Sequence, residues 1–163
     1  MRTVTIGIDP GASGAICTLD YRGDIIECED LGNVANGGVT SPALFAALLD
    51  RMTHGIPDSI GVAVVEHVHA RPPASAASIG KLCTSYGIVL GALAHAGIRI
   101  ETVTPAVWKR AMRVGTGQKD PNAVAANRWP HDRDLFLRKL DKDRAEACLL
   151  AAWWLDRAEA VAA

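Results

Sequence analysis

Four acidic side chains occupy positions from which a folded chain could bring them together. Asp9 ends an alternating apolar segment near the start of the chain, and Glu66 follows five apolar residues. Asp143 and Glu146 are three residues apart at the start of an Ala-rich segment, a spacing that places both on one face of a helix. Clustered carboxylates repel one another unless cations share them, and their oxygens favour Mg²⁺ or Mn²⁺. Two such ions about 3.5 to 4 Å apart stabilise phosphoryl displacement, so the pattern indicates that chemistry.

Each of these acids also has a simpler structural explanation. Asp9 precedes Pro10 and Gly11 and could be a turn residue, while Glu66 could end its strand at solvent. Asp143 could cap a helix, where an acidic group suits the helix dipole. The combination of all four favours a metal site over these separate explanations.

The nearly neutral net charge conceals two oppositely charged regions. The 163 residues are 49% apolar and carry 17 basic and 18 acidic side chains. Residues 1–70 hold three basic and nine acidic groups, whereas residues 99–144 hold eleven basic and six acidic ones. This asymmetry suits a protein that binds a polyanion and keeps carboxylates for metal, although chance clustering of surface charge gives the same pattern.

The cysteines and the apolar segments indicate a cytoplasmic protein. Cys17, Cys28, Cys83 and Cys148 are far apart and form no CxxC motif, which predicts core thiols in a reducing compartment. The N-terminus reaches Asp9 too soon for a signal peptide. The most apolar segment, 79–100, is interrupted by basic residues and histidine, so we expect no membrane span.

The element pattern predicts a single α/β domain over residues 1–163, with a mixed five-stranded sheet and helices on both faces. The expected strands are 3–9, 15–19, 25–29, 60–66 and 98–103, and the expected helices are 42–52, 75–96, 105–112, 121–128 and 143–161, with a Gly- and Asn-rich loop over 33–40. Three glycines within 75–96 each cost about 1 kcal/mol of helix stability, which predicts close approach of another backbone, unless the helix is simply buried on its own sheet. Trp153 and Trp154 could pack on the sheet or on a partner.

Five segments, in this order and at these distances, resemble the RuvC family of Holliday-junction resolvases, in its phage and prophage branch: IGIDPGASGAI, VVEHVHARP, SYGIVLGALAHAGI, VTPAVWKRAM and KDRAEACLLA. The match runs from about residue 3 to 154, whereas the first segment alone is also typical of sugar kinases and actin-like ATPases. The resemblance implies a ribonuclease H-like fold and a homodimer in the cytoplasm of a bacterial or phage-infected cell. It also implies cutting of four-way DNA junctions with two metal ions.

The resemblance further implies roles for individual residues. Asp9, Glu66, Asp143 and Glu146 match the metal ligands, with Asp141 as a rival to Asp143 and with Glu146 in place of the family's usual Asp. Lys109 and Lys119 match basic residues beside the scissile phosphate, and Trp108 is expected to be a packing anchor. The residues expected to contact DNA are His69, Arg71, Lys81, Lys109, Arg110, Arg113 and Lys119. His69 stands where some members carry an aromatic wedge, and a zinc site of His67 with His69 is disfavoured by its spacing.

These expectations together describe a Mg²⁺- or Mn²⁺-dependent endonuclease that acts on branched DNA and uses no nucleotide cofactor. Its products would be symmetric nicks with 5′-phosphate and 3′-hydroxyl ends. A non-catalytic junction-binding module is the main alternative, because Glu146 departs from the family pattern. An actin-like ATPase or kinase is a weaker one, since 163 residues cannot contain its second lobe.

Overall fold

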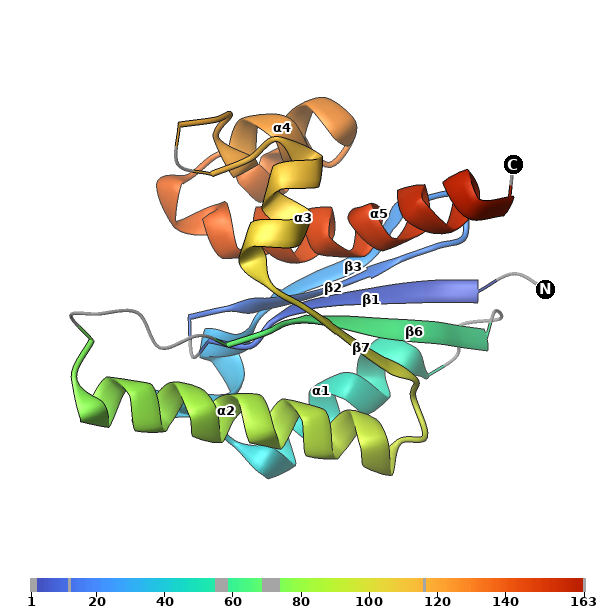
Figure 1. The fold of residues 1–163 in the computed structure, drawn as a ribbon. Helices are drawn as coiled ribbons and strands as arrows, with labels where there is room; N and C mark the ends of the chain where they lie inside the picture. Colours follow the sequence, from blue (N-terminus) through green and yellow to red (C-terminus); the bar gives the residue numbers. More distant parts are fainter. Residues whose placement is uncertain (1–2, 12, 55–58, 69–73, 116, 163) are drawn as a thin grey trace.

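Five strands form one mixed sheet with helices on both faces, as predicted (Figure 1). This computed structural model describes residues 3–11, 13–54, 59–68, 74–115 and 117–162. The strand order is β3-β2-β1-β6-β7, with β1 antiparallel to β2 and parallel to β6. The strands of this sheet are β1 (Thr3–Asp9), β2 (Ala15–Leu19), β3 (Ile25–Asp30), β6 (Ser59–Glu66) and β7 (Ile100–Val103).

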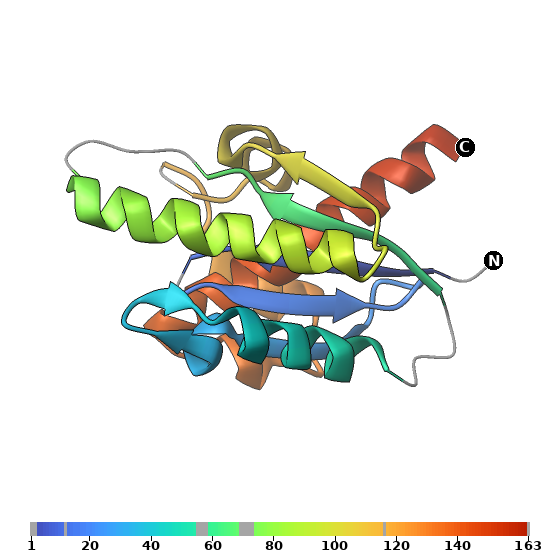
Figure 2. The ribbon, with the colours of Figure 1, turned by 90° about the horizontal axis from the view of Figure 1, so that it is seen from below.

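The helices form one layer on each side of the sheet (Figures 1 and 2). One face carries α1 (Pro42–Thr53) and α2 (Ala76–His95), and the other carries α3 (Pro105–Met112), α4 (Pro121–Arg128) and α5 (Lys142–Ala162). All five were predicted to within one residue at each end. The predicted loop over 33–40 contains a small hairpin, β4 (Ala35–Asn36) and β5 (Val39–Thr40). The sequence prediction also missed three short 3₁₀ helices, Leu31–Val34, Arg133–Phe136 and Lys139–Asp141, because segments of three or four residues show no periodicity.

Alternation along the two central strands decides which side chains face α5. In β1, Ile6 and Ile8 belong to the core under α1 and α2, so Gly7 and Asp9 face the opposite side. In β6, Val62 and Val64 belong to the core under α5, and Glu66 continues that series. Because β1 and β6 are parallel and Ile8 pairs with Val65, Asp9 and Glu66 leave neighbouring strand ends on the same face.

Gly7 allows α5 to lie directly on β1. A Cβ atom at this position would stand 2.1 Å from the Ala147 carbonyl oxygen and 2.9 Å from the Ala151 backbone nitrogen. Both contacts are with backbone, which cannot rotate away, so only glycine fits. This approach fixes the first turns of α5, and with them Asp143 and Glu146, against the strand that ends in Asp9.

The outer face of α2 has no neighbour within the described chain. A Cβ at Gly80, Gly87 or Gly91 would find nothing within 4 Å, so the backbone contact expected of these glycines is not made within the described residues. Only 17% of the most apolar window of α2 is buried, and its mean hydropathy of 1.3 would suit a membrane span by length and composition alone. That criterion is weak, because helices of soluble proteins also meet it.

The C-terminal tryptophans and the four cysteines differ in how far they are buried. Trp153 is buried on the sheet, and Trp154 packs against the same core with its ring edge toward Trp153. Cys17 and Cys148 are buried and Cys28 is half-buried, but Cys83 is exposed. The prediction of four core thiols is therefore wrong for Cys83, because α2 buries little of its surface and residue 83 lies outside the buried stripe.

Candidate active site

The four acidic side chains that the sequence singled out converge at one edge of the sheet. The pKa of Asp9 is raised to about 7, first by burial and then by the negative charges of Glu66, Asp143 and Glu146. Glu66 and Asp9 line one hollow of about 300 Å³, and Glu146 lines a second of about 480 Å³. The two hollows share Pro105 and Lys109, so they form adjoining parts of one groove.

Local backbone geometry presents Asp9 at the end of β1. The strand turns sharply after it, and the Gly11 N–H donates to Asp9 Oδ1 at 3.4 Å. Gly14 closes the turn with its N–H on the Gly11 carbonyl, and a Cβ on Gly14 would stand 2.1 Å from the Asp9 carbonyl oxygen. The glycines therefore serve the turn, while the Asp9 carboxylate remains facing α5.

The first two turns of α5 supply the other two acids. Burial raises the pKa of Asp143, and the charge of Glu146 raises it further, while a hydrogen bond with Ser13 acts in the opposite direction. Glu146 is only 5% exposed. Two carboxylates withdrawn from water so close to Asp9 create a strongly negative site.

Lys109 stands among these carboxylates. Its Nζ lies 2.7 Å from Glu146 Oε2 and 3.8 Å from Glu66 Oε2. The residue comes from α3, which begins two residues after β7 and carries the ammonium back over the strand ends. A fixed positive charge here can offset repulsion among the acids and stabilise charge on a reacting phosphate.

Trp108 contacts the site through its indole nitrogen. The side chain is fully buried, as expected of a packing anchor, but its Nε1–H also donates to Glu66 Oε2 at 2.7 Å. This second role was missed in the sequence. A buried indole N–H almost always has a partner, so the position of Trp108 next to Lys109 was the available indication.

The residues present fit a divalent cation. Glu146 Oε1 is buried and has no hydrogen-bond partner, although Lys142 Nζ lies within ion-pair distance at 3.4 Å. Buried acceptors are nearly always satisfied, and a cation would satisfy this one together with the clustered negative charge. Within the described residues, no three acidic side chains place oxygens within 4.8 Å of one another.

Asp141, the rival ligand, points elsewhere. It is 2% exposed, accepts from the Arg138 guanidinium at 2.7 Å and from the Arg138 backbone N–H at 2.7 Å. These bonds lower its pKa and cap a 3₁₀ helix. The structure therefore groups Asp143, and not Asp141, with the other acids.

Four basic side chains line the hollow beside the acids: Lys109, Arg110, Lys119 and Lys142. Lys119 reaches it because the segment after α3 folds back, with a bridge between Val114 and Lys119. This hollow therefore brings four cations next to Glu146, with Asp120 also in its lining.

The remaining residues expected to contact DNA are not part of this groove or are not described. Arg113 is exposed in a left-handed conformation (φ 56°) at the end of α3 and lines neither hollow. Lys81 lies on α2 and donates to the Gly37 carbonyl at 2.8 Å. His69 and Arg71 fall outside the described residues. His67 lines the hollow of Asp9 and Glu66, with its ring edge against Tyr86.

No family model and no curated protein matches this sequence. Two solved structures match it along nearly the whole chain. One is of Thermus thermophilus RuvC in complex with Holliday junction substrate, at 14% identity and a TM-score of 0.62, covering 95% of this chain and 96% of that one. The other is of Thermus thermophilus RuvC, at 16% identity and a TM-score of 0.60, covering 96% and 97%. The chain therefore has the fold of RuvC, the ribonuclease H-like fold that the sequence resemblance implied.

Proposed function

We propose that this protein is a metal-dependent endonuclease that hydrolyses phosphodiester bonds in four-way DNA junctions. The observation that carries the proposal is the convergence of Asp9, Glu66, Asp143 and Glu146 beside Lys109, next to a hollow lined by four basic side chains. The shared fold adds support, because one of its solved examples holds a Holliday junction substrate.

In this proposal the four carboxylates hold two Mg²⁺ or Mn²⁺ ions. Such ions lower the pKa of bound water and neutralise charge on the phosphoryl oxygens in an in-line displacement. The protein's own part is to orient the ligands: the Trp108 N–H fixes Glu66, and the Gly11 N–H holds Asp9. Hydrolysis would leave 5′-phosphate and 3′-hydroxyl ends that DNA ligase can rejoin.

The basic side chains of this hollow would hold the DNA backbone. Lys109 and Lys119 would support the phosphate nearest the acids, and Arg110 lines the same hollow. Contacts of this kind recognise shape and phosphate position more than base sequence, so binding should weaken steeply with salt.

We also propose that the protein acts in the cytoplasm as a homodimer built on α2. Most of this helix is exposed although its mean hydropathy is 1.3, and its three glycines leave room for a second backbone. A two-fold dimer would place two active sites so that opposite strands are nicked symmetrically. Gly87→Arg enters open space within one chain, so it should leave the fold intact and give a monomer by sedimentation; an unchanged dimer would place the interface elsewhere.

Replacing Asp9 by Asn tests the proposed chemistry. Cleavage of a four-way junction, a fork and a linear duplex would be measured in Mg²⁺ and in Mn²⁺, with junction binding measured in parallel. The Asp9→Asn variant should bind the junction and fail to cut it, because it lacks one charged ligand. Asp50→Asn, which changes an exposed acid on α1, is the matched control and should cut normally.

Each rival function predicts a different result. Equal cutting by wild type and Asp9→Asn would rule out the proposed site. Junction binding with no cutting by the wild-type protein would indicate a binding module. Nucleotide hydrolysis in the absence of DNA would indicate the kinase-like alternative.

A further inference from the structure

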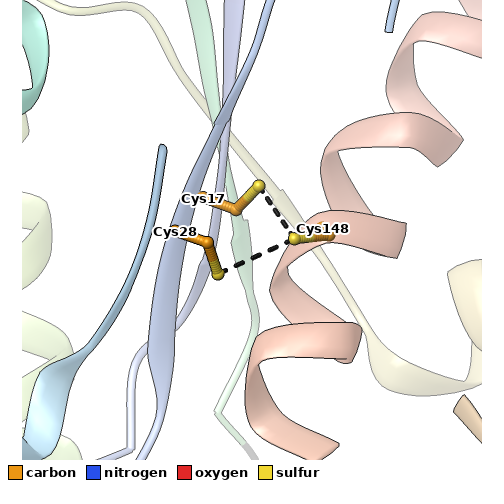
Figure 3. A group of neighbouring side chains, drawn as sticks. All are labelled: Cys17, Cys28 and Cys148. Atoms are coloured by element: carbon orange, nitrogen blue, oxygen red, sulfur yellow. Dashed lines mark hydrogen bonds between the residues drawn. The ribbon is translucent and has the colours of Figure 1, made fainter. Parts of the chain in front are cut away.

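Three cysteines that are far apart in the sequence meet under α5. Cys17 of β2 and Cys28 of β3 are directly paired across the two strands, and Cys148 of α5 points down between them (Figure 3). Cys148 Sγ lies 2.9 Å from Cys17 Sγ and 3.8 Å from Cys28 Sγ. Within the described residues, this is the one group of three metal-ligating side chains whose donor atoms all lie within 4.8 Å of one another.

The convergence follows from the packing of α5 on β1. Gly7 pairs with Cys17 across the β1–β2 ladder, so Gly7, Cys17 and Cys28 form one row across the sheet. The absence of a side chain at Gly7 lets Ala147 reach the sheet, which brings the adjacent Cys148 onto the same row. The group is therefore held by the backbone and not by flexible loops.

We infer that Cys17, Cys28 and Cys148 form a binding site for a soft, thiophilic metal ion with three sulfur ligands, such as Cu(I). With metal–sulfur bonds of about 2.3 Å, a trigonal arrangement sets its sulfurs about 4 Å apart. The separation of Cys148 and Cys28 already fits, and rotation about one Cα–Cβ bond can widen that of Cys148 and Cys17.

The donor set selects the kind of ion. Thiolates favour soft ions such as Cu(I) and Zn²⁺, but structural zinc is almost always four-coordinate. A three-sulfur group in a dry core therefore suits Cu(I) better. Binding replaces three S–H bonds with three metal–sulfur bonds, releases up to three protons to solvent and needs no electron transfer when copper is supplied as Cu(I).

The three thiols differ in their access to solvent. Cys17 and Cys148 are buried, and Cys28 is half-buried. Cys28 would therefore be the first ligand to meet an incoming ion.

The test is an anaerobic titration of the fully reduced protein with Cu(I), in competition with a chromogenic Cu(I) chelator. Wild type should take up one equivalent, and its thermal midpoint should rise. Cys83→Ser, which changes the exposed fourth cysteine, is the matched control and should behave as wild type. Cys148→Ala and Cys28→Ser should each bind Cu(I) more than about a hundredfold more weakly than wild type. A hundredfold loss is the upper range for removing a group that only supports a metal ligand.

Copper X-ray absorption on the loaded wild type gives a readout that needs no variant to fold. Three sulfur neighbours are expected, whereas nitrogen or oxygen neighbours would overturn the assignment. Failure to bind Cu(I), or Zn²⁺ uptake that Cu(I) cannot displace, would overturn it as well. Because these measurements involve neither DNA nor Mg²⁺, their outcome is independent of the proposed nuclease activity.

Discussion

The acidic group and the cysteine cluster both take side chains from the N-terminal part of α5, yet they differ in chemistry and surroundings. Glu146 and Cys148 are two residues apart, but Glu146 lines an open hollow, and Cys148 lies in the core against Cys17 of β2 and Cys28 of β3. The acids stand apart with Lys109 between them, whereas the sulfurs are in mutual contact. Two residues along one helix thus separate a group of oxygen donors at a groove from a group of sulfur donors in the core.

The largest expected effect is on DNA cleavage, and it distinguishes the acidic group from the cysteine cluster. Glu146→Gln should lower single-turnover cleavage on the order of 10³-fold, because it removes a charge from the reacting centre. Cys148→Ala changes α5 two residues away and should leave cleavage within a few-fold of wild type. Equal losses in both variants would mean that displacement of α5, and not ligand chemistry, explains the effect of Glu146.

The next effect is on the pH dependence of the free energy of unfolding in the absence of divalent ions. The pKa of Asp9 is about 7 in the folded chain and 3.8 as a free side chain, so the folded state holds this proton more tightly. The contribution of this proton to the stability of the folded state is fully present below about pH 4 and is lost as the pH rises through 7. A pKa difference of about three units corresponds to a loss of at most about 4 kcal/mol in the free energy of unfolding. Because Asp9 is in partial contact with solvent, we expect a loss of about 2 kcal/mol.

Urea unfolding between pH 5 and 8 measures this loss. Asp9→Asn should show a flatter profile than wild type, and added Mg²⁺ should flatten the wild-type profile too. Titration of Cys17 and Cys148 should add nothing in this window, because burial raises the pKa of both thiols above its ordinary value. A profile unchanged by Asp9→Asn would contradict the electrostatic coupling of the acids.

The smallest expected effect concerns the support of Glu66. Trp108→Phe keeps most of the buried ring volume but removes the N–H that holds Glu66 Oε2. Cleavage should fall about tenfold, and the Mg²⁺ concentration for half-maximal activity should rise, as for loss of other groups that orient metal ligands. Trp154→Phe, on the same core but without a bond to an acid, should change neither value. If Trp108→Phe lowers stability but leaves the Mg²⁺ concentration for half-maximal activity unchanged, Trp108 has a packing role only.

The sequence predicted the acidic group better than the cysteine cluster for a physical reason. Asp9 and Glu66 are at the ends of clearly patterned strands, and Asp143 and Glu146 share a helix face by spacing alone. The cysteines meet only through the register of β2 on β3 and the height of α5 above Gly7, which no local pattern contains. The bond from Trp108 to Glu66 depends in the same way on how α3 returns over the sheet.

The first motif, IGIDPG, contains two residues that are under different constraints: Asp9 by its proposed chemistry and Gly7 by packing against α5. Asp9 would be released from selection in a descendant that bound DNA without cutting it. Gly7 would not, because any larger residue collides with the backbone of α5 whatever the protein does. Among divergent relatives, glycine at this position should therefore mark common architecture, and aspartate two residues later should mark retained catalysis.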